Sequence, residues 1–216
     1  MQVLQDALIA FVGIFVIVNP VGTVPLFLAM TANDDLLRRQ ATSRIAAITV
    51  LIVLVGAALL GQTILSFFGV GVPALRIAGG VILFLIGLDM LNVRTTRTKT
   101  TDEEVQQGVA KAEVGIIPLG CPMLAGPGSI ATVMLMRSHI AHDVGGLSAL
   151  LIACLLVALA TWMILRLSLK AGPWLTPSVL GIISRLEGLL LCAIAAEMVV
   201  RGLNETMSIG VRIQPP

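Results

Sequence analysis

Hydrophobic residues gather in six long runs along the chain, and short polar segments separate the runs. A helix needs about 20 apolar residues to cross a hydrocarbon core of ~30 Å, and each run has roughly that length. The pattern therefore predicts an all-α integral membrane protein with six transmembrane helices. The runs cover residues 7–30, 45–68, 72–91, 114–136, 144–165 and 180–200.

One polar segment is longer than the others and divides the pattern into two halves. Residues 93–113 lie between the third and fourth runs, so we expect residues 1–92 and 114–216 to form two three-helix units of one membrane domain. Within the loop, Thr101 followed by Glu104 resembles a capping box, which predicts a short surface helix from Asp102.

The composition supports a lipid environment. Hydrophobic residues make up 57% of the chain and charged residues 12%, and the mean hydropathy is +1.01. A soluble domain does not need this much apolar surface. A net charge of +2 without a basic cluster argues against a nucleic-acid partner. The first ten residues lack the basic segment of a cleaved signal peptide, so we expect the first run to be retained.

Two of the runs contain helix-starting signals in their interior. Asn19 precedes Pro20 in the first run, and Gly126-Pro127-Gly128 lies within the fourth. Asparagine caps helices, and proline is favoured at the first helical position. Because lipid cannot satisfy free backbone groups, such breaks should face protein or a water-filled cavity.

The two halves also resemble each other. The break at Pro20 corresponds to the break at Pro127, and the segment from Arg76 in the third run corresponds to the segment from Arg185 in the sixth. A unit of three spans is odd, so its second copy enters the membrane in the opposite direction. The sequence thus predicts two inverted three-helix repeats with the first and fourth helices broken, an arrangement typical of transporters with a midplane site.

The distribution of Lys and Arg predicts the orientation. With both termini outside, nine basic residues fall in inner segments and three in outer segments, in accordance with the positive-inside rule. An alternative topology, in which the first and fourth runs are re-entrant hairpins and both termini lie inside, satisfies the rule as well. We prefer full spans, because the two parts of a broken run together are long enough to cross the core.

Four stretches of the sequence resemble one family. VNPVGTVPLFLAM, RIAGGVILF, PLGCPMLAGPGSIATV and RLEGLLLCAIAAEMVVRG occur in order over almost the whole chain. In these stretches the chain resembles the MarC family of six-span bacterial membrane proteins, within the LysE transporter superfamily. The resemblance implies transport of small neutral amino acids across the cytoplasmic (inner) membrane of a bacterium. Cys121 and Glu187 depart from the family pattern, in which apolar residues are expected at these positions.

The breaks themselves suggest how a substrate would bind. A half-helix that begins inside the membrane directs free amides and a positive dipole end toward the centre, where a substrate carboxylate can bind. Glycines at the breaks allow close approach of a small molecule, and nearby amide and hydroxyl groups can contact its ammonium group or an ion. The predicted substrate-binding residues are Asn19, Pro20, Gly22, Thr23, Gly126, Pro127, Gly128, Ser129 and Thr132.

Charged residues within the third and sixth runs predict ion pairs. If these spans are antiparallel, Arg76 and Glu197 lie toward the outer side, whereas Asp89 and Arg185 lie toward the inner side. Opposite charges would then meet at each end, with Glu187 close to the inner pair.

Other chemistry has little support in the sequence. His139 and His142 fall in a short segment between runs, which favours a solvated loop over a metal site. The three cysteines form no C-x-x-C pair, and no nucleophile and base are recognisable together, so we expect neither a cofactor, a metal nor enzymatic activity. The expected partners are a small-molecule substrate and membrane lipid. A coupling ion (proton or sodium) and a homo-oligomer are left open, and a non-transporting scaffold or assembly factor remains the alternative function.

Overall fold

The computed structural model describes residues 2–91, 115–140, 144–171 and 177–212, and the regular structure within these ranges is helical. This arrangement confirms the predicted all-α class. The polar loop and the short helix expected from Asp102 lie outside the described residues.

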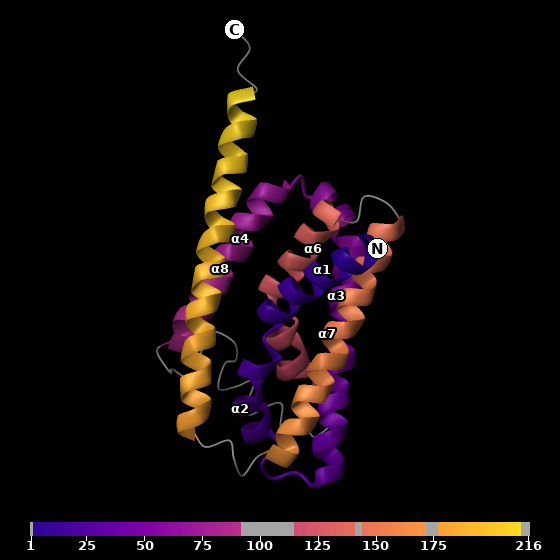
Figure 1. Cartoon of the computed structure of the whole chain (residues 1–216), viewed down its shortest axis with the longest axis vertical. Helices are drawn as coiled ribbons and strands as arrows, with labels where there is room; N and C mark the ends of the chain where they lie inside the picture. The colour runs from indigo at the N-terminus through magenta and orange to yellow at the C-terminus, as the bar shows by residue number, and fades with distance from the viewer. Residues whose placement is uncertain (1, 92–114, 141–143, 172–176, 213–216) are drawn as a thin grey trace.

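Each half of the chain contributes one broken helix and two long helices (Figure 1). The first half contains α1 (Gln2–Val18), α2 (Pro20–Met30), α3 (Leu36–Phe67) and α4 (Val72–Leu91). The second half contains η1 (Gly115–Leu124, a π-helix), α6 (Pro127–Ile140), α7 (Val144–Ala171) and α8 (Pro177–Arg212).

The two halves run in opposite directions (Figure 1). In that view α1 and α2 descend, α3 ascends and α4 descends, whereas η1 and α6 ascend, α7 descends and α8 ascends. The beginning of α1 and the end of α8 therefore lie toward the same end of the molecule. Because α1 and α2 continue in one direction, their arrangement favours a full span over a re-entrant hairpin.

Four spans are long and apolar enough to cross a membrane by length and composition among the described residues: Val3–Met30, Leu36–Phe67, Val72–Leu91 and Val144–Ala171. The fourth and sixth predicted runs correspond to the broken η1–α6 pair and to α8, which carries Arg185, Glu187, Glu197 and Arg201. Several helices extend beyond the predicted runs. α3 begins at Leu36, where Asp35 accepts a hydrogen bond from the Arg38 amide at 3.0 Å.

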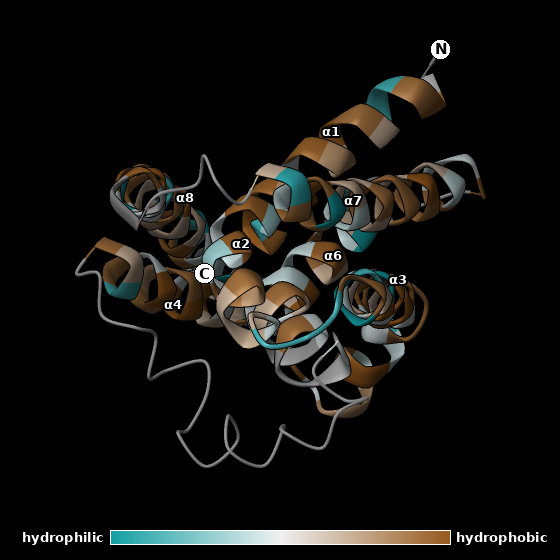
Figure 2. Cartoon of the chain, turned by 90° about the horizontal axis from the view of Figure 1, so that it is seen from below, coloured by the Kyte–Doolittle hydropathy of each residue, from teal (hydrophilic) through white to brown (hydrophobic). Residues whose placement is uncertain are grey.

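The helices pack as two groups. The main hydrophobic core joins side chains of α1, α2, α3, η1, α6 and α7, including Ile14, Phe27, Leu54, Leu124 and Leu150. A smaller core around Leu83, Leu191 and Ala195 joins α4 to α8. Figure 2 shows the α4–α8 pair beside the other helices.

Glycines let α4 and α8 approach closely in antiparallel orientation. A Cβ at Gly80 would lie 2.8 Å from the Ala195 carbonyl oxygen, and one at Gly188 would lie 2.8 Å from the Gly87 carbonyl oxygen. Near the other end of α4, a Cβ at Gly202 would lie 3.0 Å from the Pro73 carbonyl oxygen. Small residues at helix contacts are a common means of close packing within membranes.

We therefore expect Gly188→Ala to destabilise the protein by about 1–3 kcal/mol, because the added methyl group meets backbone atoms that cannot rotate away. Gly181→Ala in the same helix is the matched control, since nothing lies within 4 Å of its Cβ position. The control should be neutral or more stable by up to ~1 kcal/mol through helix propensity. Unfolding free energies in mixed micelles measure both effects. Equal effects of the two substitutions would contradict the close contact.

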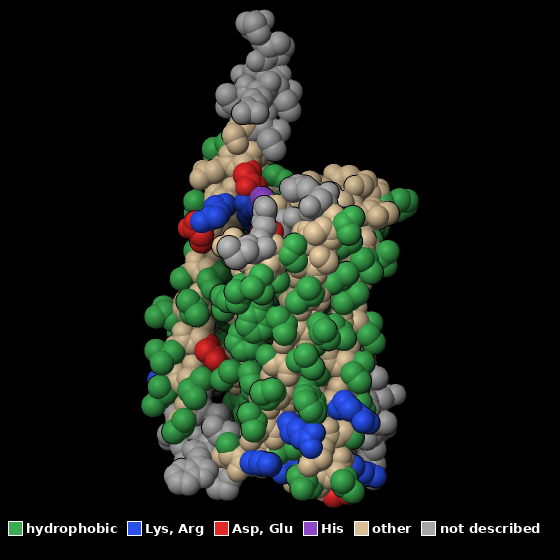
Figure 3. Space-filling model, turned by 45° about the vertical axis from the view of Figure 1, so that its right-hand side comes forward, with side chains coloured by type: hydrophobic (Ala, Val, Ile, Leu, Met, Phe, Trp, Pro, Cys, Tyr) green, Lys and Arg blue, Asp and Glu red, His purple; other side chains and the backbone are tan. Residues whose placement is uncertain are grey.

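The surface separates into an apolar belt and two charged ends (Figure 3). Large apolar side chains such as Ile52, Leu59 and Leu155 are exposed on the long helices, as expected for contact with lipid. Basic residues gather at the lower end, where α3 begins and α7 ends; they are Arg38, Arg39, Arg44, Arg166 and Lys170. By the positive-inside rule we expect this end to face the cytoplasm.

Reporter fusions test this orientation. A reporter placed within residues 92–114 should report the cytoplasmic side, and one placed after residue 212 should report the outer side. Alkaline phosphatase and fluorescent-protein fusions, read in parallel, distinguish the two sides. A cytoplasmic signal from the fusion after residue 212 would contradict the orientation and favour the re-entrant topology.

Candidate functional site

The first break is a local helix start at Asn19. This residue has φ 48° and ψ 62°, a left-handed conformation that asparagine adopts more readily than most residues. Its Oδ1 accepts a hydrogen bond from the Gly22 amide at 2.9 Å, and Pro20 occupies the first position of α2. The Thr23 hydroxyl donates to the Asn19 carbonyl oxygen at 3.2 Å. The predicted asparagine cap is confirmed. The Gly22 amide at the start of α2 is therefore already hydrogen-bonded to the Asn19 side chain.

The second break lies between η1 and α6. The Ala125 amide donates to the Gly120 carbonyl oxygen at 2.9 Å, and the Ser129 hydroxyl donates to the Leu124 carbonyl oxygen at 2.9 Å. Ser129 belongs to α6, so its side chain satisfies a carbonyl that η1 leaves at its end. The chain then continues as α6 from Pro127, as the Gly-Pro-Gly pattern predicts.

The two breaks meet in space. A cavity of about 10 Å³ lies between them, with room for about one water molecule. Its lining comes from both halves of the chain: Ile17, Asn19, Leu83, Ile86, Met123, Gly126, Gly128, Ser129 and Leu191. A larger cavity of about 190 Å³ also reaches Asn19 and Leu191; the rest of its lining is Phe15, Val16, Pro20, Val21, Glu187 and Leu190.

The structure brings together some of the predicted substrate-binding residues and not others. Asn19, Gly126, Gly128 and Ser129 line the small cavity, and Pro20 lines the larger one. Thr23 and Thr132 are buried, and their hydroxyls donate to carbonyl oxygens of residues four positions earlier in the chain. Pro127 is exposed. A role in substrate binding stays a prediction for all of these residues.

Glu187 of α8 reaches the first break. Its Oε2 is 2.7 Å from the position that a Cβ at Gly22 would occupy, and Asn19 Nδ2 is 2.6 Å from the same position. The carboxyl group therefore packs against the first turn of α2 at the break. Because Glu187 is two positions from Arg185 along α8, the two side chains leave the helix on different faces.

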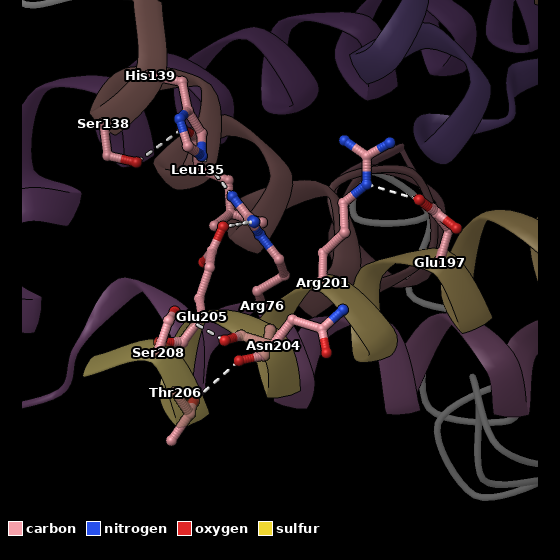
Figure 4. Close-up of polar contacts among 11 residues, drawn as sticks. Arg76, Leu135, Ser138, His139, Glu197, Arg201, Asn204, Glu205, Thr206 and Ser208 are labelled. Carbon is pink, nitrogen blue, oxygen red and sulfur yellow. Dashed lines mark hydrogen bonds and ion pairs between the residues drawn. The ribbon is translucent and has the colours of Figure 1, made fainter. Parts of the chain in front are cut away.

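The outer charge cluster joins three helices (Figure 4). Arg76 of α4 is buried, and its guanidinium forms an ion pair with Glu205 of α8 and a hydrogen bond with His139 of α6. Glu197, the expected partner, instead pairs with Arg201 at 2.6 Å on the exposed face of α8. The correction follows from α8, which continues to Arg212 and so carries Glu205 to the buried guanidinium.

The second predicted charge pair, Asp89 and Arg185, lies near the other end of α4. Gly188 packs against Met90, so Asp89 and Arg185 lie at the same end of the α4–α8 pair, as the antiparallel arrangement predicts. Arg185 is exposed, and its ion pair with Asp89 stays a prediction. Among the residues that the structure describes, no group of three or more His, Cys, Asp or Glu side chains could hold a metal ion.

The sequence did not reveal His139 and Glu205 as partners of Arg76. His139 was expected in a loop, whereas it lies in the last turn of α6. Glu205 lies beyond the sixth apolar run, and hydropathy carries no information on where the helix continues. The buried arginine near the end of α4 was the available signal, because such a charge requires partners.

We expect Arg76→Ala to reduce the unfolding free energy by about 2–4 kcal/mol, since it removes a buried partner of Glu205. The expected loss of unfolding free energy is smaller than for a fully buried pair, because the Glu205 side chain is 38% exposed. Arg201→Ala, which removes an exposed pair, should cost about 0.5 kcal/mol or less. A double-mutant cycle of Arg76→Ala with Glu205→Gln measures the coupling. Strict additivity would show that the two side chains do not stabilise each other.

The chain is similar to proteins of one family over nearly its whole length. Residues 4–207 match the family described as MarC family integral membrane protein. The UPF0056 membrane protein YhcE of Escherichia coli (strain K12) is 32% identical over 198 residues, which are 90% of this chain and 90% of that protein. The UPF0056 membrane protein YvbG of Bacillus subtilis (strain 168) is 33% identical over 196 residues, 90% of this chain and 92% of its own length. A UPF0056 membrane protein of Methanocaldococcus jannaschii is 35% identical over 201 residues, which are 93% of this chain and 97% of that protein.

No solved structure matches the chain. The extent of the match, together with the helical membrane architecture, shows that the chain belongs to the MarC family of integral membrane proteins.

Proposed function

We propose that the protein is a secondary transporter that moves small neutral amino acids across the cytoplasmic membrane. The observation that carries the proposal is the meeting of two helix breaks, one from each half, at a common cavity lined by Asn19, Gly126, Gly128 and Ser129. Broken helices at corresponding positions of inverted repeats form the substrate sites of many transporters.

The chemistry of the breaks suits a carboxylate. The first turns of α2 and α6 direct their positive dipole ends toward the cavities, and such ends bind anionic groups. At α2 the Gly22 amide is held by Asn19 Oδ1, so an incoming carboxylate would displace that side chain or bind beside it. Backbone close to the small cavity at Gly128 leaves little room, which favours a small substrate.

The cavities and the two helix groups suggest how access would alternate. The small cavity has room for about one water molecule, and the larger cavity beside it has room for a small amino acid. Both are lined by residues of α1 and α8, which belong to different groups. A rocking motion of the α4–α8 pair against the other helices would open the site to one side at a time.

Transport by purified protein in proteoliposomes tests the proposal. The wild type should exchange labelled alanine or glycine for unlabelled substrate across the membrane. Asn19→Ala should abolish exchange while costing only about 1 kcal/mol of helix-cap stability. Gly128→Leu should also abolish exchange, because a Cβ at this position would lie only 2.5 Å from Leu83 Cδ2.

Gly56→Leu is the matched control for the second variant, since nothing lies within 4 Å of its Cβ position. It should leave exchange unchanged. Normal exchange in both Asn19→Ala and Gly128→Leu would overturn the site. No exchange of any small neutral amino acid by the folded wild type would overturn the transport function and favour a scaffold or assembly role.

A further inference from the structure

Glu187 is the ionisable side chain that lines the larger cavity at the α1–α2 break. Its Oε2 has less than 1 Å² of accessible surface and no hydrogen-bond partner among the described residues. The same oxygen lies against Gly22, in the first turn of α2. An ordinary structural carboxylate would be paired or solvated, and this oxygen is neither.

The elements around Glu187 supply little charge to balance it. α1 and α2 contain no ionisable side chain between Asp6 and Asp34, and η1 contains only the thiol of Cys121. α4 contributes Asp89 near this end, which carries the same sign as an ionised Glu187, whereas Arg76 lies at the other end with Glu205. On α8 itself, Arg185 is exposed. The main local partners for a negative Glu187 are therefore the positive end of the α2 dipole and the side-chain amide of Asn19 beside it.

The first turn of α2 would have to interact with two anionic groups. An ionised Glu187 uses the α2 N-terminus as its counter-charge, and the substrate carboxylate of the proposed transport would use it as well. Two carboxylates close together cannot both remain ionised without a large electrostatic penalty. Protonation of Glu187 removes the conflict, because a neutral carboxyl group can also donate a hydrogen bond.

We propose that Glu187 is a proton-binding site that couples substrate movement to a proton, an inference that rests on the proposed transport. The ionised carboxylate occupies the α2 N-terminus in the absence of substrate. A proton from the side to which the site is open binds Glu187, and the substrate carboxylate then takes its place at α2. After the site opens to the other side, substrate and proton leave, and the carboxylate returns to the helix. Proton and substrate increase each other's affinity by the same factor, as linkage requires.

Accumulation driven by a pH gradient tests the coupling. With one proton per substrate, a gradient of about one pH unit supports roughly tenfold accumulation of labelled alanine in wild-type proteoliposomes. Glu187→Gln should exchange alanine at equal pH on both sides, with a KM that no longer depends on pH, but should not accumulate it. Glu197→Gln is the matched control on the same helix, because Glu197 is exposed and pairs only with Arg201 in the structure. It should accumulate alanine as the wild type does.

Several results would overturn the inference. Wild-type accumulation by Glu187→Gln would do so, and so would loss of equal-pH exchange in a Glu187→Gln protein that remains monodisperse. Accumulation that requires a sodium gradient and Glu187 would replace the proton with a metal cation. These outcomes leave the transport function standing, whereas absence of exchange by the wild type removes that function.

Infrared spectroscopy tests proton binding to Glu187 without a transport assay. A protonated carboxyl group in an apolar site gives a carbonyl band that an ionised group lacks. We expect a pH-dependent band in the wild type and in Glu197→Gln, and its loss in Glu187→Gln. Identical carboxyl spectra of wild type and Glu187→Gln at every pH would show that Glu187 does not bind a proton.

Discussion

A backbone amide or carbonyl that loses its helical partner inside a bilayer finds no water to replace it. The two helix breaks of this protein are possible because short side chains supply the missing partners. Asn19 Oδ1 accepts from the Gly22 amide, and the Ser129 hydroxyl donates to the Leu124 carbonyl oxygen. Each repair is made within a few residues of its break. Neighbouring helices therefore need not close over the breaks, and cavities remain beside them.

The packing of the two halves brings the repaired breaks together. The α1–α2 helix of the first half packs on α7 of the second, and the η1–α6 helix of the second half packs on α3 of the first. The corresponding helices α4 and α8 pack on each other, as do α3 and α7. This exchange of partners is what an approximate twofold relation in the membrane plane produces. It also explains why the cavity between the breaks has residues from both halves in its lining.

The elements that depend on local sequence were predictable, and the contacts that depend on distant segments were not. Hydropathy predicted where the helices lie, and Asn-Pro and Gly-Pro-Gly predicted the breaks. The antiparallel α4–α8 pair followed from the repeat. Hydropathy could not show that α8 continues past residue 200, so the partner of Arg76 was wrongly predicted as Glu197. Nor does sequence spacing show that Glu187 meets α2, because that contact depends on the angle at which α8 packs.

The two halves share the order of one broken helix followed by two long helices, but they differ in their chemistry. Arg76 and Arg185 occupy corresponding positions, yet Arg76 is buried in the cluster with Glu205 and His139, whereas Arg185 is exposed. Two positions further along, Glu187 corresponds to Ala78. At the break in the first half the Glu187 carboxyl group packs against the first turn of α2, whereas the corresponding residue of α4, Ala78, is exposed. Opening of the site to either side of the membrane by similar movements would require no chemical difference between the two halves. Coupling to one proton per cycle does need a difference, because two equivalent carboxyl groups would bind two protons. In the proposed coupling, the presence of Glu187 where the other half has Ala78 supplies that difference.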